Sequence, residues 1–356
     1  MAQHPPDDLR NAVRAFAIEG SLERADPLHR GHIHDTFVST WATPSGPRRF
    51  LHQRMNDQVF KDVEGLMHNV ARITQHLSET APSAGSDLVA LELVPTREGA
   101  PYLRWQDGPW RTYHYIANTT SFDRPTDAGM AHDAARAFGD FLARLESLPA
   151  TELRETIPRF FSSPYRLEQL DAARTADAAG RAGSVEAELA FVAERRAFVP
   201  VMAEGLANGK IPARIVHGDT KLNNVLFDDA THRPRCIVDL DTCMPGYALY
   251  DFGDLARFTA ATAAEDEQDL SKVSVDLELY GALSEGYLTG AGAALTPYER
   301  DLMPAAARLV TLTIGMRFLA DYLNGDVYFK TDYDDHNLVR ARVQFALVRE
   351  MERRLP

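Results

Sequence analysis

The sequence predicts an α+β protein built of two lobes, on three observations. Predicted strands and one long helix fill residues 1–117, whereas residues 118–356 are mostly helical with a few short strands. Strands grouped apart from helices in this way are typical of α+β proteins. A polar segment at 117–125 separates the two parts, and the length of 356 residues fits one large two-lobed unit. A cleft between the lobes is the default expectation for ligand binding.

The N-lobe, defined as residues 1–117, is predicted to hold a sheet and one long helix. Turn residues at 43–47 and 107–109 each join a pair of strands into a hairpin. Residues 58–78 place apolar side chains at helical spacing. The expected elements are a short helix at 7–19, a turn and strand at 31–40, strands at 49–55, 87–94, 102–105 and 110–116, and the helix at 58–78.

The C-lobe, defined as residues 118–356, is predicted to be mainly helical. Its Ala-rich stretch at 127–147 carries large apolar residues on one face, which is typical of a core-facing helix. The expected helices are 127–147, 184–209, 273–290, 298–323 and 336–354, and the expected short strands are 214–216, 224–227 and 235–239.

Composition narrows the classes of partner. The formal net charge of −13 argues against nucleic acid and anionic membranes, which both reward basic surfaces. The two cysteines lack a metal-site or disulfide pattern, and no apolar run is long enough to cross a membrane. The N-terminus does not resemble a secretory signal, so we expect a cytoplasmic protein. A monomer and a dimer both fit these features.

The segment 214–258 carries the chemistry. Its residues His217, Asp219 and Asn224 match the pattern His-x-Asp-x-x-x-x-Asn, and Asp239 follows a short apolar strand. Phosphoryl transfer needs a carboxylate that accepts the proton of the attacking hydroxyl, and an amide and a second carboxylate that hold Mg²⁺. We therefore predict Asp219 as the base and Asn224 and Asp239 as metal ligands. Lys221 is placed to offset charge on the transferred group.

A second acidic motif, Asp251-Phe252-Gly253, spells the metal-binding triplet of protein kinases. No apolar strand ends at Asp251, whereas residues 236–238 form one that leads directly to Asp239. We therefore assign metal binding to Asp239, with Asp241 as a candidate second ligand. Asp251 and Asp254 are expected to brace the loop or to cap a helix that starts near Leu255.

Several segments together resemble the aminoglycoside phosphotransferase and choline kinase superfamily, and most closely the N-acetylhexosamine 1-kinases. The superfamily has a protein-kinase-like fold, and ATP and Mg²⁺ are its cofactors. The segments that carry the resemblance are GHIHDTF at 31–37, FLHQRMN at 50–56, WRTYHYI at 110–116, HGDTKLNNVLFD at 217–228, VDLDTCMPG at 238–246, LYDFGDLARF at 249–258 and RFLADYLNGDVYFK at 317–330.

The resemblance implies roles for nucleotide-side residues. Gly31 and His32 resemble the loop that closes over the phosphates and the sugar, and ATP is implied at the hinge Tyr115–Ala117. The strand that normally carries a phosphate-binding Lys reads Phe-Leu-His-Gln-Arg at 50–54, without a Lys. Arg54 is therefore the expected source of that positive charge.

The resemblance also implies an acceptor pocket. Arg317, Tyr328 and Phe258 resemble the residues that grip the sugar and its N-acetyl group. Judged from the sequence alone, Tyr328 and Phe258 are expected to pack in the core, and only the resemblance favours a role in the pocket.

Together these features predict an ATP- and Mg²⁺-dependent kinase that phosphorylates the anomeric hydroxyl of N-acetylglucosamine or N-acetylgalactosamine to the α-1-phosphate. One alternative is the same chemistry on an aminoglycoside, choline, homoserine or methylthioribose. A very acidic pocket in the C-lobe would favour a polycationic acceptor. The other is a nucleotide-binding pseudokinase, which the intact Asp219, Asn224 and Asp239 disfavour.

Overall fold

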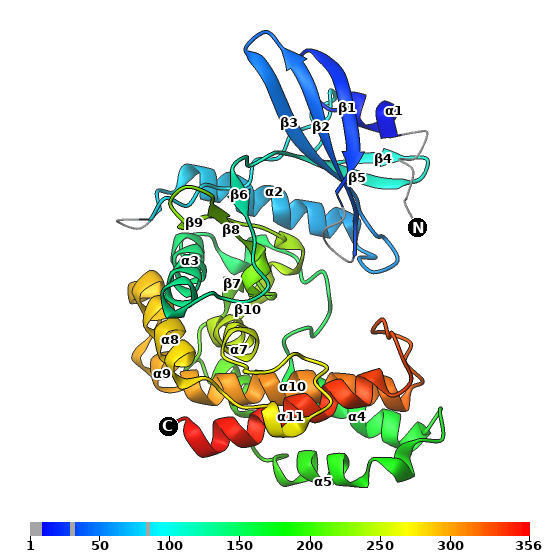
Figure 1. Cartoon of the computed structure of the whole chain (residues 1–356), viewed down its shortest axis with the longest axis vertical. Helices are drawn as coiled ribbons and strands as arrows, with labels where there is room; N and C mark the ends of the chain where they lie inside the picture. The colour runs from blue at the N-terminus through cyan, green and yellow to red at the C-terminus, as the bar shows by residue number, and fades with distance from the viewer. Residues whose placement is uncertain (1–8, 29–32, 83–85) are drawn as a thin grey trace.

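The computed structural model describes residues 9–28, 33–82 and 86–356. A five-stranded antiparallel sheet forms one end of the molecule and a group of helices forms the other (Figure 1). In spatial order its strands are β1 (Ser21–Pro27), β2 (Asp35–Thr43), β3 (Gly46–Arg54), β5 (Gly108–His114) and β4 (Leu103–Trp105).

The two faces of this sheet have different neighbours. One face carries Phe50 and Trp110, which pack with the short helix α1 (Leu9–Arg14) in a small separate core. The opposite face carries Leu51 and Tyr113, which join the main core of the molecule. Because side chains alternate along a strand, position in β3 or β5 decides which face a residue occupies.

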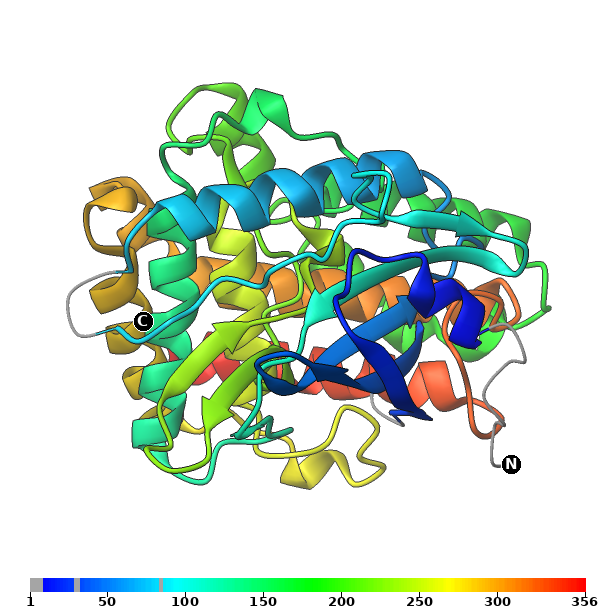
Figure 2. The same ribbon diagram turned by 90° about the horizontal axis from the view of Figure 1, so that it is seen from above.

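Helix α2 (Val63–Glu79) runs beside the sheet and over the helices of the C-terminal part (Figure 2). The side chain of Asp62 caps its first turn by accepting the Gly65 amide at 2.8 Å. Its apolar face enters the main core, so α2 connects the sheet to the rest of the protein.

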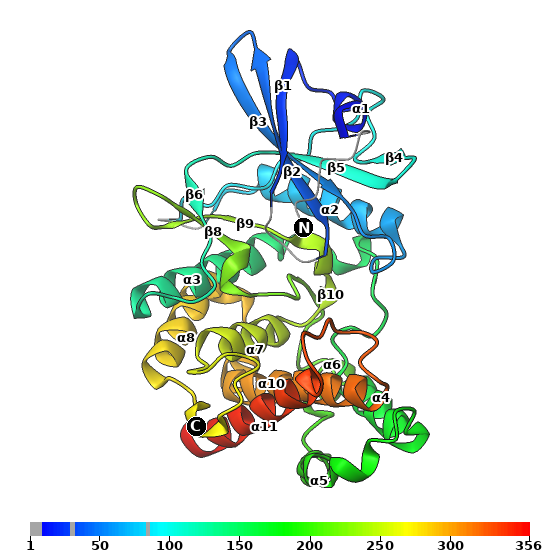
Figure 3. The same cartoon turned by 45° about the vertical axis from the view of Figure 1, so that its right-hand side comes forward.

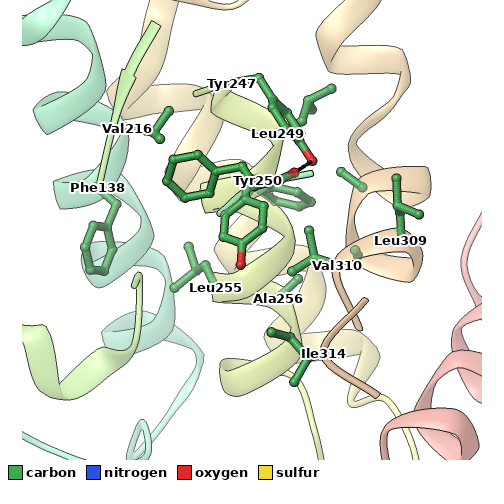
Figure 4. Packing of buried hydrophobic residues seen from close by; sticks show 14 of the residues in the cluster. Phe138, Val216, Tyr247, Leu249, Tyr250, Leu255, Ala256, Leu309, Val310 and Ile314 are labelled. Atoms are coloured by element: carbon green, nitrogen blue, oxygen red, sulfur yellow. Dashed lines mark hydrogen bonds between the residues drawn. The ribbon is translucent and has the colours of Figure 1, made fainter. Parts of the chain in front are cut away.

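The C-terminal part is built around α10, which packs against α4, α7 and α11. Figure 4 shows Leu255 and Ala256 of α7 beside Leu309, Val310 and Ile314 of α10. The helices are α3 (Ala128–Leu145), α4 (Ser163–Ala176), α5 (Glu186–Glu194), α6 (Val201–Ala207), α7 (Ala248–Thr259), α8 (Leu277–Ala291), α9 (Pro297–Asp301), α10 (Met303–Leu323) and α11 (His336–Arg354).

Short strands lie between the sheet and α7 (Figure 3). One pair joins β7 (Arg214–Val216) to β10 (Met244–Gly246). A three-stranded group joins β6 (Thr119–Thr120), β8 (Val225–Asp228) and β9 (Pro234–Ile237). These pairings bring the loop after β7 next to the loop after β9.

The α+β prediction and most predicted elements are confirmed, but several elements differ. Strand β1 is not predicted, and the helix expected at 298–323 is divided at Leu302 into α9 and α10. Residues 87–94 form only isolated bridges, to Cys236 and Tyr113, rather than a strand. The helix expected at 184–209 forms as two helices, Glu186–Glu194 and Val201–Ala207, with turns at 195–200 between them. Helices α4 and α7 were not predicted over their full length. No described helix is long and apolar enough to cross a membrane.

Candidate active site

The loop after β7 brings three predicted residues into contact. The Nδ2 of Asn224 donates to the backbone oxygen of Asp219 at 2.8 Å and to its Oδ2 at 3.2 Å. The ammonium of Lys221 lies 2.9 Å from the same Oδ2. Because the Asn224 nitrogen is used in this way, its side-chain oxygen remains as a ligand for a metal.

Backbone and ring contacts tie this loop to the one that carries Asp239. The Val238 amide donates to the Asn224 carbonyl at 2.9 Å, and the His217 Nε2 lies 3.0 Å from the Val238 carbonyl. His217 is fully buried, with the ring of Phe138 packed against it edge-on. His217 therefore orients the two loops through its hydrogen bond and its packing.

The acidic pair on α7 braces the loop from below, as the sequence predicts. The two carboxylate oxygens of Asp251 each accept a backbone N–H at 2.8 Å, from His217 and Gly218. Asp254 accepts the Thr220 amide at 3.1 Å. Burial raises the pKa of Asp251 to about 6. Asp251 is thus committed to holding the loop and is not a metal residue.

Gly218 is required by the loop's path. Its φ of +79° lies in the left-handed region, and a Cβ built there would meet the Phe161 ring and the Thr242 carbonyl at 2.9 Å. A side chain is excluded by both the backbone conformation and the space.

Asp239 has a left-handed backbone with φ +62° and begins a 3₁₀ turn over Leu240–Thr242. Asp239 is an exposed residue, yet protein atoms surround its carboxylate. The resulting loss of hydration, together with the nearby charges of Asp241 and Asp219, raises the pKa of this carboxylate. Left-handed non-glycine residues are concentrated at functional sites. A divalent cation would relieve this repulsion between carboxylates.

The donor set fits Mg²⁺ as phosphoryl-transfer sites hold it. Within the described part of the chain, no three His, Cys, Asp or Glu side chains form a metal cluster by themselves. In such sites one or two carboxylates hold the ion together with the substrate phosphates. Asp239 and the Asn224 oxygen would be the protein's share of that coordination.

Asp241 occupies a different position from the one expected. Both of its oxygens accept hydrogen bonds from the guanidinium of Arg111, one of them at 2.9 Å, and the His34 ring contacts it as well. Burial alone would raise the pKa of Asp241, but the charge of Arg111 and the contact with His34 hold it below its ordinary range. The expectation that Asp241 is a free second metal ligand is therefore corrected, since the carboxylate is already occupied.

Arg54 also requires a correction. It lies on the same face of β3 as Phe50 and His52, which points away from the main core. Its guanidinium donates hydrogen bonds to two carboxylates, from Nε to Asp35 Oδ2 at 3.0 Å and from Nη1 to Asp107 Oδ2 at 3.1 Å. The opposite face of the sheet carries Arg111 of β5, which pairs with Gln53. Its Nε donates to Gln53 Oε1 at 2.9 Å.

The nucleotide-side positions fall into two groups. The ring of Tyr115 stacks under the guanidinium of Arg49, with 3.9 Å between Cζ and the ring centroid, and Ala117 is exposed in the connection that follows β5. Gly31 and His32 lie outside the described residues. His34, which follows them in the sequence, contacts the Asp241 carboxylate through its Nε2. Its Nδ1 accepts a hydrogen bond from the Asn56 amide at 3.0 Å.

The acceptor-side residues make two sets of contacts. Phe258 lies beside the catalytic loop, with its ring centroid 5.8 Å from the Lys221 Nζ. Arg317 and Tyr328 lie together, with 5.8 Å between the guanidinium carbon and the Tyr328 centroid. Tyr328 is 66% exposed, so the alternative of core packing does not hold for it.

Sequence reasoning missed Arg111, Gln53 and His34. A single clue was present: Arg111 is a charged residue in an aromatic strand, on the face that it shares with Tyr113. Its partner Asp241 is 130 positions away, which no local pattern reveals.

Comparison with known proteins identifies relatives. The model of the phosphotransferase enzyme family matches residues 25–287. An aminoglycoside phosphotransferase from Alicyclobacillus acidocaldarius is similar in structure, at 14% identity and a TM-score of 0.63, covering 99% of this chain and 97% of that one. A microcompartment-associated aminopropanol kinase has 16% identity, a TM-score of 0.60 and coverages of 97% and 96%.

A third similar structure is choline kinase from Cryptosporidium parvum, at 14% identity and a TM-score of 0.56, covering 93% of this chain and 89% of that one. Identities this low are informative about the fold alone. They confirm the predicted kinase-like arrangement of an antiparallel sheet followed by a helical part.

Proposed function

Because the chain belongs to the phosphotransferase enzyme family, we propose that it transfers the γ-phosphoryl group of ATP to the anomeric hydroxyl of an N-acetylhexosamine. N-acetylglucosamine and N-acetylgalactosamine are the proposed acceptors, and the α-1-phosphate is the product. The observation that carries the proposal is the hydrogen-bonded cluster of Asp219, Lys221 and Asn224 facing the Asp239 loop.

The proposed cleft lies between the lobes 1–117 and 118–356. The hinge at Tyr115–Ala117 would hold the adenine, and the segment with Gly31 and His32 would close over the phosphates. When bound, Mg²⁺ would neutralise charge on the phosphates, with Asn224 and Asp239 as its protein ligands.

The chain's own residues would act by positioning and proton transfer. Asp219 accepts the proton of the sugar's 1-hydroxyl as that oxygen bonds to the γ-phosphorus, and the bond from phosphorus to the ADP oxygen breaks in line. Lys221, whose pKa the neighbouring Asp219 raises although burial alone would lower it, stays protonated and stabilises the transferred group. Arg317, Tyr328 and Phe258 are the proposed contacts to the sugar.

An acceptor panel tests this function. ADP release is measured with N-acetylglucosamine, N-acetylgalactosamine, choline, homoserine, methylthioribose and an aminoglycoside. We expect turnover with the two N-acetylhexosamines at the highest kcat/KM. Turnover only with another acceptor would show that the chain acts on a different substrate within its family. If no acceptor in the panel leads to ADP release, the pseudokinase alternative is supported.

The variant Asp219→Asn tests the proposed base. It keeps the size of the side chain and removes its proton affinity, so kcat should fall at least about a hundredfold. Nucleotide binding, followed by fluorescence titration, should change little, because the proposed contact of Asp219 is to the acceptor hydroxyl. A matched control is Asp229→Asn, on the surface after β8. A near-normal kcat in Asp219→Asn would remove Asp219 from this role.

A further inference from the structure

A second group of cations lies beyond the phosphoryl-transfer residues, where α4 meets α10. Arg166 is in the first turn of α4, and Arg317 lies in the second half of α10. One turn before Arg317, the hydroxyl of Thr313 donates to the Ser163 Oγ at 2.8 Å, which fixes the two helices against each other. The guanidinium carbons of Arg166 and Arg317 consequently approach the same ring, that of Phe160, at 5.8 and 5.4 Å from its centroid.

Within the described residues, these two charges have no counter-charge. Neither Arg166 nor Arg317 forms an ion pair with a carboxylate there, although the chain has 51 acidic residues against 38 basic ones. Arg166 donates only to the Gln169 Oε1 at 2.8 Å and to the Phe160 carbonyl at 3.2 Å, and its Nε is buried without a partner. Burial and the adjacent charge of Arg317 lower the pKa of Arg166 to about 10.

Fold stability does not explain the arrangement. Arg166 is only 9% exposed, and a buried cation without a carboxylate partner is costly. It also lies at the positive end of the α4 dipole, where an anion is stabilised and a cation is not. An apolar side chain would pack there more favourably, so the position is suited to a negatively charged ligand.

The cluster adjoins the catalytic loop and is open to solvent on one side. Phe161, next to Phe160, is the ring that packs on Gly218, and it also contacts Tyr250 of α7 at 4.6 Å between centroids. Tyr328 borders the other side of Arg317 and is largely exposed. Phe160 and Phe161 therefore link the two arginines to the catalytic loop, beside the proposed position of the acceptor.

We infer that Arg166 and Arg317 form an oxyanion subsite, which binds a carboxylate or sulfate group carried by the acceptor sugar. This inference rests on the proposed function and narrows its substrate class. Two guanidinium groups with aromatic walls bind an oxyanion through charge-assisted hydrogen bonds. The same charges repel an amine, so the subsite selects against cationic acceptors.

The first test measures binding without nucleotide or sugar. Thermal unfolding is followed in sodium sulfate and in sodium chloride at equal ionic strength, for wild type, Arg166→Gln, Arg317→Gln and the surface control Arg159→Gln. We expect sulfate to raise the Tm of wild type and Arg159→Gln by several degrees more than that of the other two variants. Equal shifts in all four proteins would overturn the subsite, whatever the enzyme's substrate is.

The second test distinguishes an acceptor-borne group from a free anion. Values of kcat/KM are compared for glucosamine, N-acetylglucosamine and N-acetylglucosamine derivatives with a carboxylate or sulfate at C3, C4 or C6. We expect at least one anionic derivative to exceed N-acetylglucosamine about tenfold, because each charge-assisted bond is worth a tenfold factor or more. The preference should disappear in Arg166→Gln and return partly in Arg166→Lys.

Two results would contradict the inference. One is that every anionic derivative is a poorer substrate than N-acetylglucosamine for the wild-type enzyme, so that the site binds sulfate only as a free ion and not as part of the acceptor. The other is that Arg166→Gln leaves the ratio of anionic to neutral kcat/KM unchanged. If no hexosamine is turned over while the sulfate effect on Tm depends on Arg166, the proposed function fails and the binding site remains.

Discussion

At the scale of single residues, the site depends on carboxylates that serve different purposes in one small volume. Asp219 is held by Lys221 and Asn224, Asp239 is an exposed residue, and both oxygens of Asp241 are bonded to Arg111. Their environments push the pKa of Asp239 up and that of Asp241 down. Residues of one chemical type are thereby separated into reacting and supporting roles.

The Arg111–Asp241 pair gives a prediction at this scale. Both side chains are almost completely buried, and the pair joins β5 to the turn after Asp239. Arg111→Met should lower the free energy of unfolding by about 3–5 kcal/mol, because it leaves the buried charge of Asp241 with only the His34 ring as a partner. It should also raise the KM for ATP more than that for the sugar, since the Asp239 turn loses its anchor.

A double-mutant cycle in urea checks the stability effect. The double variant Arg111→Met, Asp241→Leu should recover much of the loss, because it removes both charges. A double variant no more stable than Arg111→Met would show that the pair is not the source of the effect.

These residue roles were only partly predictable. The motif with Asp219 and Asn224 is local, so its spacing in the sequence is enough to identify it. Arg54 was misassigned because its distance along β3 suggested a phosphate contact, whereas the alternation of side chains puts it on the opposite face from Gln53. The partners of Arg111 and Arg166 depend on contacts between distant segments.

At the scale of elements, α7 supports the catalytic loop from beneath. Asp251 and Asp254 belong to consecutive turns of its buried face and receive three backbone N–H groups from residues 217–220. The loop geometry therefore depends on a helix that follows it in the sequence. The sequence predicted this bracing, but it placed the helix start near Leu255 rather than at Ala248, because the motif Leu-Tyr-Asp-Phe-Gly-Asp was read as loop.

Bracing by a buried carboxylate predicts a pH dependence of stability. The pKa of Asp251 is about 6 in the folded protein, above the value of about 3.9 expected for an unfolded chain. Between these values the folded state binds more protons, so this group makes the free energy of unfolding fall as the pH rises from about 4 to about 6. The full effect is on the order of 2–3 kcal/mol.

Urea unfolding between pH 4 and pH 7 measures this contribution. Asp251→Asn cannot titrate and should have a flatter profile than wild type, while Asp57→Asn, at an exposed site, should keep the wild-type slope. Parallel profiles for wild type and Asp251→Asn would contradict the assignment of a raised pKa to Asp251.

At the scale of the whole molecule, the sheet and the helical part are joined by α2 and by contacts that converge on the two loops. The separation of strands from helices along the chain is visible in composition and periodicity, which is why the fold class could be predicted. The isolated bridges at 89 and 93 could not be, because Val89 pairs with Cys236 and Leu93 with Tyr113, and both partners are distant in sequence. The negative net charge of the chain is consistent with a site in which a few basic side chains, such as Lys221 and Arg111, lie close to the carboxylates.

The central claim is phosphoryl transfer to the anomeric oxygen of an N-acetylhexosamine. The most direct measurement is ³¹P NMR of a reaction with ATP, Mg²⁺ and N-acetylglucosamine, with Asp219→Asn as the inactive control. The account predicts an ADP signal together with a sugar phosphate whose phosphorus couples to the anomeric proton of an α-linked product. Phosphate on any other sugar oxygen, or ADP with free inorganic phosphate only, would contradict it.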